Sequence, residues 1–293
     1  MMLDAFAFRH VVDRLRQENP KAKILLFNNP YFAFGDKFWQ ASSPGAVDQA
    51  SKAYSLKTES NETIRYGGPI YEGLDVEQKI TMMDITNPAW QDYFAKQSRK
   101  HVDACGFDGV FIDTLTEDIP PFAIAPGNKY PKGYTKEKWK EGNYQFLRKV
   151  TNAFKGSSSI IMFNGITRSP GTHPSGPPNT GMLKMVEGAA IEAYSVYKSL
   201  DSSNKSKQWY FHKTILGDLK QAADQGKWMV IEVYGDRDDD QLRLYALSSF
   251  LMVQSERIFF YFTRKDQAGA LHWRPEWSVR LGKPAGSYQK GAS

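Results

Sequence analysis

The segment Gly106-Phe-Asp-Gly-Val-Phe-Ile-Asp-Thr-Leu115 runs from a turn through apolar residues to an acid at Asp113. Within it, residues 108–115 have the length and composition of a short buried strand. Six more apolar runs of strand length, each bounded by Gly, Asn, Ser or Asp, occupy residues 23–29, 79–86, 158–165, 188–195, 228–235 and 257–263. Runs that are apolar on both faces are typical of parallel strands covered by helices.

The segments between these runs predict helices. Residues 87–106 have Asn87 as an N-cap, Pro88 at the first helical position and Gly106 at the far end. Helical spacing of apolar residues also marks segments 136–156, 211–226 and 240–254. The alternation predicts an α/β fold, either a (β/α)8 TIM barrel or a doubly wound open sheet. The barrel is favoured, because neither GxGxxG nor the P-loop pattern follows any run.

The seven predicted strands are one short of the eight that a barrel needs. Residues 4–18 have the pattern of an amphipathic helix closed by Pro20, so the absent element is the first strand of the barrel. Either the N-terminus is truncated or a strand is overlooked. Residues 51–60 are a weak candidate and fit better as a hairpin in the long first loop. We expect a single (β/α) barrel domain over residues 1–293.

The composition excludes several classes of protein. With 41% hydrophobic and 24% charged residues, the 293-residue chain has ample material for a core and is not disordered. Its one cysteine, Cys105, rules out an internal disulfide and Cys-rich zinc sites, and no run is long enough for a membrane span. The net charge of +6 is diffuse apart from residues 132–140, which argues against a nucleic-acid partner. That segment is either a solvated face or a surface with affinity for an anionic polymer.

Polar side chains stand at the carboxyl ends of the predicted strands, where parallel α/β folds bind their ligands. Asp113 and Glu192 are the strongest candidates, because each follows apolar residues directly and an unpaired carboxylate there is costly. A loop cap or a pair with Arg is the alternative for Asp113. The other predicted pocket residues are Asn28, Asp84, Asn164, Tyr194, Glu232, Tyr261 and, as a stacking platform, Trp273. Asp84 has a structural alternative in the turn before the helix, and Glu232 lies beside an acid-rich loop.

Two carboxyl groups that face one pocket suit glycoside hydrolysis. A protonated one gives its proton to the leaving oxygen, while an ionised one attacks the anomeric carbon or activates water. Aromatic residues beside turns, as in 28–35 and 271–277, suit a sugar ligand, although aromatics also pack beneath loops. The five histidines lack metal-ligand spacing and no GxSxG is present, which disfavours zinc and serine hydrolases. We therefore expect no metal and no cofactor.

Four motifs follow one another in a distinctive order: D-I-T-N-P-A-W (84–90), G-F-D-G-V-F-I-D (106–113), F-N-G (163–165) and I-E-A-Y (191–194). Together they resemble the glycosyl-hydrolase-like TIM-barrel families, which are similar to the α-amylase-type superfamily and to endo-α-1,4-polygalactosaminidase-like proteins. LGKPAGSY (281–288) also looks like the closing segment of such domains. The resemblance spans about residues 20–290.

The resemblance implies that Asp113 is the nucleophile and Glu192 the acid/base of a glycosidase. This chain departs from amylase-type enzymes in two respects. They carry the acid/base Glu at the end of the fifth strand, where Asn164 stands here, and the family would have a strand before residue 4. Glu192 follows on the sixth strand. Many proteins of this kind are exported, and the first residues contain no signal peptide. We expect a secreted or periplasmic protein if the N-terminus is truncated, and a cytoplasmic one otherwise.

The expected function is hydrolysis of a poly- or oligosaccharide, with α-linked substrates favoured. Two alternatives stay open. One is a catalytically inactive barrel that binds a glycan. The other is a Mg²⁺-dependent lyase or isomerase with Asp84, Asp113 and Glu192 as metal ligands, which the absence of Lys at the predicted strand ends disfavours. The expected partner is a carbohydrate, with no nucleic acid and no membrane span.

Overall fold

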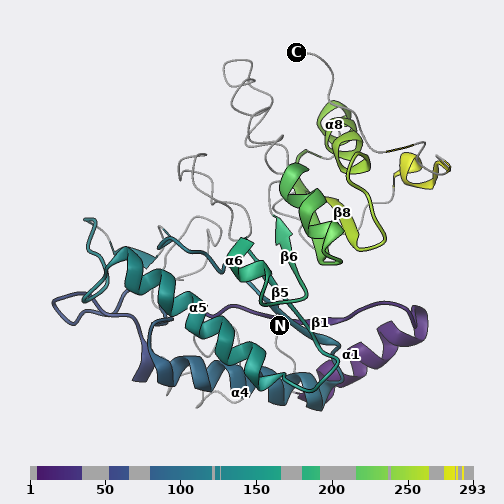
Figure 1. Ribbon diagram of the computed structural model, residues 1–293. Coiled ribbons are helices and arrows are strands. Elements are labelled where there is room, and N and C mark those ends of the chain that lie inside the picture. Colours follow the sequence, from purple (N-terminus) through teal and green to yellow (C-terminus); the bar gives the residue numbers. More distant parts are fainter. Residues whose placement is uncertain are drawn as a thin grey trace. The chain divides into compact units, whose positions relative to one another are not determined.

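The computed structural model describes residues 5–34, 53–65, 80–120, 123–125, 127–165, 180–191, 216–236, 239–263, 274–280, 282 and 286. The chain divides into two compact units. Unit 1 comprises Met1–Gly165 and Asn179–Glu187, and unit 2 comprises Ile166–Pro178 and Gly188–Ser293. Both units contain parallel strands and helices (Figure 1).

The core of unit 1 is a parallel sheet in the order β1-β4-β5. Its strands are β1 (Leu25–Asn28), β4 (Gly109–Ile112) and β5 (Ile160–Asn164). The register pairs Asn28 with Ile112, and Ile112 with Phe163. The ladder continues past these pairs, since the amide of Asp113 donates to the carbonyl of Asn28 at 2.9 Å. Three of the predicted parallel strands are thereby confirmed.

Helices α1 (Ala5–Glu18), α4 (Pro88–Cys105), α5 (Lys136–Ala153) and the single turn α6 (Thr180–Leu183) belong to unit 1. Helix α4 begins and ends as predicted, because the Asn87 side chain caps its start and Gly106 adopts φ 75° after its end. Helices α4 and α5 lie alongside each other (Figure 1). Among the helices of the described residues, none combines the length and apolar character needed to cross a bilayer.

One face of the unit 1 sheet is covered by α4. Leu26 is 5% exposed, whereas its neighbour Phe27 is 57% exposed. The side-chain Nδ2 atom of Asn28 donates a hydrogen bond to the hydroxyl of Ser98 on α4 at 3.0 Å. Because side chains alternate along a strand, Leu26 and Asn28 face the helix, and Phe27 and Asn29 face the other side.

The apolar run at 79–86 does not form a parallel strand of this sheet, so that prediction was wrong. Strand β3 (Ile80–Met82) pairs antiparallel with β2 (Phe32–Phe34) in a separate two-stranded sheet. The amide of Met82 also donates to the carbonyl of Ile64 at 3.0 Å, which joins β3 to the hairpin of residues 55–65. An apolar run indicates burial but carries no strand direction, so the pattern could not distinguish a parallel from an antiparallel partner.

Unit 2 contains the parallel strands β6 (Gly188–Ile191), β7 (Trp228–Tyr234) and β8 (Ile258–Thr263), with β7 paired to both neighbours. Helix α8 (Asp240–Leu251), a 3-10 turn η6 (Pro275–Ser278) and helical residues 216–224 complete its described part. The Arg243 guanidinium joins α8 to η6 through its ion pair with Glu276. The predicted parallel strands at 188–195, 228–235 and 257–263 are confirmed where they are described.

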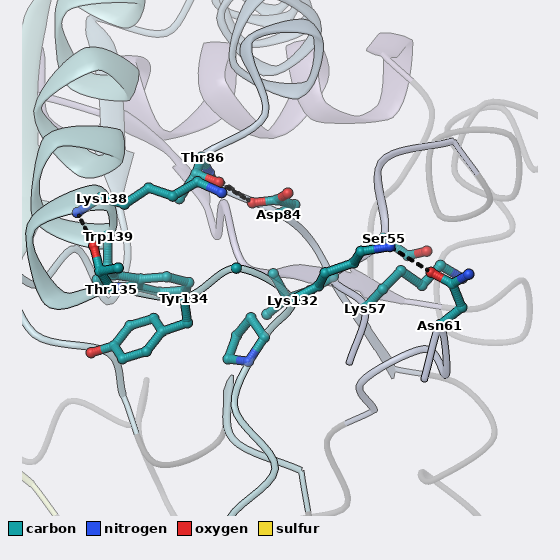
Figure 2. A pocket seen from close by; sticks show the side chains of 13 residues that line it. Ser55, Lys57, Asn61, Asp84, Thr86, Lys132, Tyr134, Thr135, Lys138 and Trp139 are labelled. Carbon is teal, nitrogen blue, oxygen red and sulfur yellow. Dashed lines mark hydrogen bonds between the residues drawn. The ribbon is translucent and has the colours of Figure 1, made fainter. Parts of the chain in front are cut away.

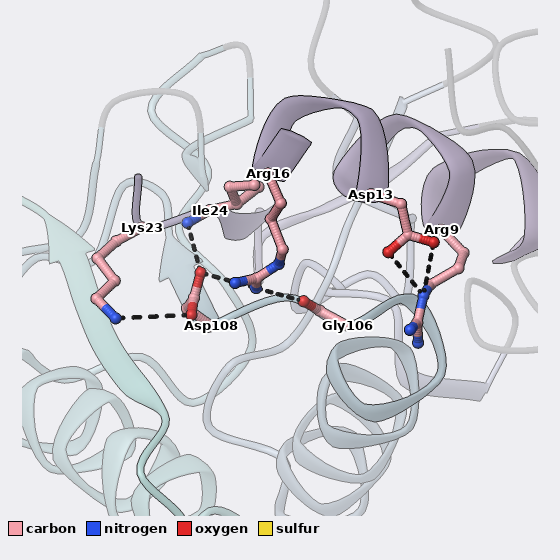
Figure 3. Close-up of polar contacts among 7 residues, drawn as sticks. All are labelled: Arg9, Asp13, Arg16, Lys23, Ile24, Gly106 and Asp108. Atoms are coloured by element: carbon pink, nitrogen blue, oxygen red, sulfur yellow. Dashed lines mark hydrogen bonds and ion pairs between the residues drawn. The ribbon is translucent and has the colours of Figure 1, made fainter. Parts of the chain in front are cut away.

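The amino edge of the unit 1 sheet is held by Asp108, which opens β4 (Figure 3). Its Oδ2 atom accepts hydrogen bonds from Arg16 Nη2 at 3.0 Å and from the amide of Ile24 at 2.9 Å. Lys23 Nζ lies 3.9 Å from Oδ1. At the same edge, the Glu187 carboxylate accepts from the amide of Ile161 at 2.9 Å. Both acids therefore stabilise strand starts.

Tyr31 joins the end of β1 to α5. Its side chain is fully buried, and its hydroxyl donates to Asn143 Oδ1 at 2.6 Å. Its ring stacks on Trp139 with 5.7 Å between centroids. Burial raises the pKa of the Tyr31 phenol above its ordinary value, because the interior disfavours the phenolate.

We expect Asp108→Ala to lower the free energy of unfolding by about 2–3 kcal/mol, because it leaves a guanidinium and a backbone amide without their acceptor. Urea denaturation would measure the loss. The matched control is Asp13→Ala, which removes an exposed i,i+4 pair with Arg9 (Figure 3) and should cost about 0.5 kcal/mol or less. Equal losses in the two variants would contradict the role of Asp108.

Tyr31→Phe should lower the free energy of unfolding at neutral pH by about 1–3 kcal/mol, since Asn143 Oδ1 loses its buried donor. Above about pH 10 the unfolded wild-type chain releases a proton that folded Tyr31 keeps, so stability falls as pH rises. Because Tyr31→Phe lacks this phenol, its free energy of unfolding should fall less steeply with pH than that of the wild type, by up to about 1.4 kcal/mol per pH unit.

Urea titrations at neutral pH and between about pH 10 and 11 test both effects. Tyr130→Phe is the control at neutral pH, because Tyr130 is 47% exposed and should lose no more than about 0.5 kcal/mol. If the free energy of unfolding of Tyr31→Phe falls with pH as steeply as that of the wild type, another group dominates the loss of stability at alkaline pH.

Candidate active site

Three polar side chains meet at the carboxyl end of the unit 1 sheet. The Asp113 carboxylate accepts a hydrogen bond from Asn29 Nδ2 at its Oδ2 atom and one from Asn164 Nδ2 at its Oδ1 atom, each at 3.0 Å. The two asparagines are each 7% exposed, and Asp113 is half-buried. An acid thus sits between amides that come from the strands on both sides of it.

The parallel register explains this meeting. Asn28 pairs with Ile112 and Ile112 with Phe163, so Asn29, Asp113 and Asn164 form the next row across β1, β4 and β5. Side chains in one row of a parallel sheet point to the same face. This row faces away from α4, because the preceding residue Asn28 contacts that helix.

Asn29 is itself held in place by the backbone. Its Oδ1 atom accepts from the amide of Tyr31 at 2.9 Å, which leaves the Nδ2 atom to face Asp113. Each oxygen of Asp113 therefore has one fixed donor and keeps lone pairs for a ligand. Among the described residues, no Lys, Arg or His forms an ion pair with Asp113, whereas Asp108 has two such partners. Within the described part of the chain, the arrangement orients a carboxylate and places no cation against it.

The backbone beside Asp113 is also unusual. Thr114 adopts φ 56°, a left-handed conformation that β-branched residues rarely take. Its neighbour Leu115 passes so close to Gly165 that a Cβ atom there would lie 2.3 Å from the Leu115 carbonyl oxygen. Gly165 has φ 127°, so glycine is required at this position for two reasons. Strained residues of this kind cluster at functional sites, where surrounding structure holds them.

Asn28 was predicted to line the pocket, and Asn29 stands beside it at the same strand end; in the structure it is Asn29 that contacts Asp113. The Asn28 amide faces α4 and binds Ser98. The two adjacent asparagines are equivalent in a sequence pattern, and only the register of β1 against β4 distinguishes them.

Asp84 shapes the turn before α4, which was the structural alternative to its predicted place in the pocket. Its Oδ1 atom accepts from the amide of Thr86 at 2.9 Å and from the Thr86 hydroxyl at 2.7 Å, which shapes the turn that leads into α4. The Asp84 side chain is half-buried and also lines a pocket. One residue therefore serves the turn and a cavity wall.

That pocket has a volume of about 470 Å³ and is built entirely from unit 1. It lies between the hairpin of residues 55–65, the turn at 84–86 and the segment before α5 (Figure 2). Its lining residues are Ser55, Leu56, Lys57, Asn61, Asp84, Thr86, Pro131, Lys132, Gly133, Tyr134, Thr135, Lys138 and Trp139. Apart from Asp84, none of them was a predicted site residue, although the basic segment 132–140 gave a signal.

The remaining predicted residues fall into two groups. Glu232 and Tyr261 are register partners on β7 and β8, so unit 2 brings these two side chains next to each other. Glu192, Tyr194 and Trp273 lie outside the described residues, and Glu192 follows directly on the last residue of β6. Within the part of the chain that is described, no three His, Cys, Asp or Glu side chains group closely enough to hold a metal ion.

Solved structures that are similar to the chain include the following two. The glycoside hydrolase domain of PelA from Pseudomonas aeruginosa is 15% identical, with a TM-score of 0.50, over 88% of this chain and 83% of that domain. The maltogenic α-amylase AmyB from Thermotoga neapolitana is 12% identical, with a TM-score of 0.47, over 87% of this chain and 49% of its own. The likeness to the PelA domain confirms the predicted α/β barrel of the TIM type.

No curated protein sequence matches the chain. The family model described as hypothetical glycosyl hydrolase family 15 matches residues 16–293, which include the Asp113 row and the pocket. This match confirms the resemblance that the four sequence motifs indicate. The chain belongs to hypothetical glycosyl hydrolase family 15.

Proposed function

We propose that the protein hydrolyses glycosidic bonds in a poly- or oligosaccharide, with Asp113 and Glu192 as its two catalytic carboxyl groups. The observation that carries this proposal is the Asp113 carboxylate, held at the end of β4 by Asn29 and Asn164 without a cationic partner among the described residues. Such a group can attack an anomeric carbon or activate a water molecule, because its charge is available to a ligand.

The second carboxyl group must protonate the leaving oxygen. Glu192 is our candidate, because it follows β6 directly at the carboxyl end of a parallel strand, where barrels assemble their sites. In the retaining form of the reaction, Asp113 forms a glycosyl-enzyme ester while Glu192 donates its proton to the departing oxygen. Glu192 then takes a proton from the water that cleaves the ester. The motif order supports α-linked glycans as the first substrates to test.

The two asparagines are positioning residues in this mechanism. Their amides fix the plane of the carboxylate, so that a lone pair of Asp113 can face the substrate before it binds. The hydrogen bond between the Tyr31 amide and Asn29 extends this orientation to the backbone.

Asp113→Asn and Glu192→Gln should each lower kcat/KM roughly 10³-fold or more, because each removes a group that acts on the reacting atoms. Reducing-end release from a panel of α-linked and β-linked oligosaccharides is the measurement. NMR of the first-formed anomer would then distinguish retention, with carboxyl groups about 5–5.5 Å apart, from inversion, at about 6.5–9.5 Å.

The matched control is Asp118→Asn, in the same loop after β4. Asp118 pairs with Lys136 at 2.9 Å and is half exposed, so its variant should keep wild-type activity within about twofold. Thermal unfolding of all three variants checks that they fold. Hydrolysis by Asp113→Asn at near the wild-type rate would disprove the assignment, and glycan binding without turnover in the wild type would favour an inactive binding barrel.

A further inference from the structure

The pocket of Figure 2 carries an excess of positive charge. Three lysines line it, namely Lys57, Lys132 and Lys138, against the single carboxylate of Asp84. Lys57 Nζ donates to the Thr63 hydroxyl at 2.5 Å, and Lys132 Nζ contacts Asn61 Oδ1 at 3.5 Å. Within the described ranges, none of the three forms an ion pair with an acid. By contrast, Lys129, Lys136 and Lys140 nearby each pair with a carboxylate.

The first turn of α5 adds to this positive potential. Thr135 caps the helix by accepting from the amide of Lys138 at 3.0 Å, and Thr135, Lys138 and Trp139 all line the pocket. The 18-residue helix therefore begins at the pocket wall. A helix start carries partial positive charge from its free amides, which favours a nearby anion.

Two buried polar atoms of the wall have no hydrogen-bond partner among the described residues. They are the hydroxyl of Ser55, a residue 8% exposed, and the indole Nε1 of Trp139, a residue 2% exposed. Buried polar groups are nearly always paired in folded proteins. An indole nitrogen can only donate and a serine hydroxyl can donate as well, so the wall contains two unsatisfied donors.

The rest of the wall suits a sugar ring. The half-buried Tyr134 offers an aromatic face at the pocket, and aromatic faces pack well against the C–H bonds of a pyranose. Asp84 has one oxygen engaged by Thr86, and its Oδ2 atom accepts no hydrogen bond within the described residues, so it can receive a sugar hydroxyl. The volume of about 470 Å³ lies in the range of small-ligand sites.

We propose that this pocket binds an anionic sugar residue, whose carboxylate, sulfate or phosphate group is recognised by Lys132, Lys138 and the start of α5. The inference rests on the proposed function, because the sugar is taken to be part of the glycan that the protein cleaves. Lys57 orders the hairpin through Thr63, and Asp84 binds a hydroxyl of the same ring. The basic segment 132–140 is then a recognition surface for an anionic polymer.

Calorimetric titration tests this directly, with Asp113→Asn protein so that no substrate is consumed. The probes are a hexuronate oligosaccharide, a sulfated oligosaccharide of equal length, neutral maltohexaose and inorganic sulfate. We expect at least one acidic oligosaccharide to bind, and its affinity to fall as sodium chloride is raised, since salt screens the lysines. Lys132→Gln/Lys138→Gln should weaken that binding roughly 10-fold or more.

The matched control is Lys129→Gln/Lys149→Gln, which changes the net charge equally. Lys129 and Lys149 pair with Glu62 and Asp92, lie in unit 1 and do not line the pocket. This variant should bind the acidic oligosaccharide within about twofold of the parent. Lys129, Lys132 and Lys138 are exposed and the Lys149 side chain is 42% exposed, so both double variants should unfold at the parent temperature.

Each outcome separates this inference from the proposed function. Cleavage of a neutral glycan, with no binding of acidic probes, overturns the inference and leaves the hydrolase intact. Lysine-dependent binding of an acidic oligosaccharide that wild-type protein does not cleave supports the pocket and contradicts the hydrolase. The anionic-sugar site is overturned if the two double variants weaken binding of the acidic oligosaccharide equally. It is also overturned if the protein binds inorganic sulfate but none of the oligosaccharides.

Discussion

The register of three parallel strands is the constraint on which the candidate active site depends. Asn29, Asp113 and Asn164 stand one residue beyond the last register pairs of β1, β4 and β5, so their side chains share a row and a face. A slip of one residue would turn the partner side chain to the helix-covered face. The Asp108 contacts at the opposite edge hold the same register from the other end.

The row of Asn29, Asp113 and Asn164 is supported by buried contacts of Tyr31. Tyr31 fixes Asn29 through its backbone amide, while its side chain reaches Asn143 and stacks on Trp139 of α5. Trp139 is also a wall of the lysine-lined pocket. The residues that orient the Asp113 carboxylate and those that shape the pocket thus share one packed support, and a loss of Tyr31 packing should disturb both.

The sequence predicted the parts of this structure that depend on local pattern. Apolar runs located the strands, and the Asn87 cap with Gly106 located α4. The direction of a strand and the face of the sheet on which each side chain lies could not be predicted, because both depend on pairing between segments that are distant in the sequence. The run at 79–86 was therefore expected to be a parallel strand although it pairs antiparallel, and the pattern could not tell which of Asn28 and Asn29 contacts Asp113.

The loop between β4 and α5 runs from the candidate catalytic residue Asp113 to the lysine-lined pocket. It opens at Asp113, passes through the left-handed Thr114, and closes at the Thr135 cap beside the pocket. Both of its ends are fixed, the first by the hydrogen bond from Leu115 to Asn164 and the last by the first turn of α5. Barrels vary such loops while keeping the strands, so the pocket can change its ligand without moving Asp113. Under the proposed anionic-sugar site, Lys132 of this loop and Lys138 at the start of α5 are accordingly the residues that should differ between relatives with different glycans.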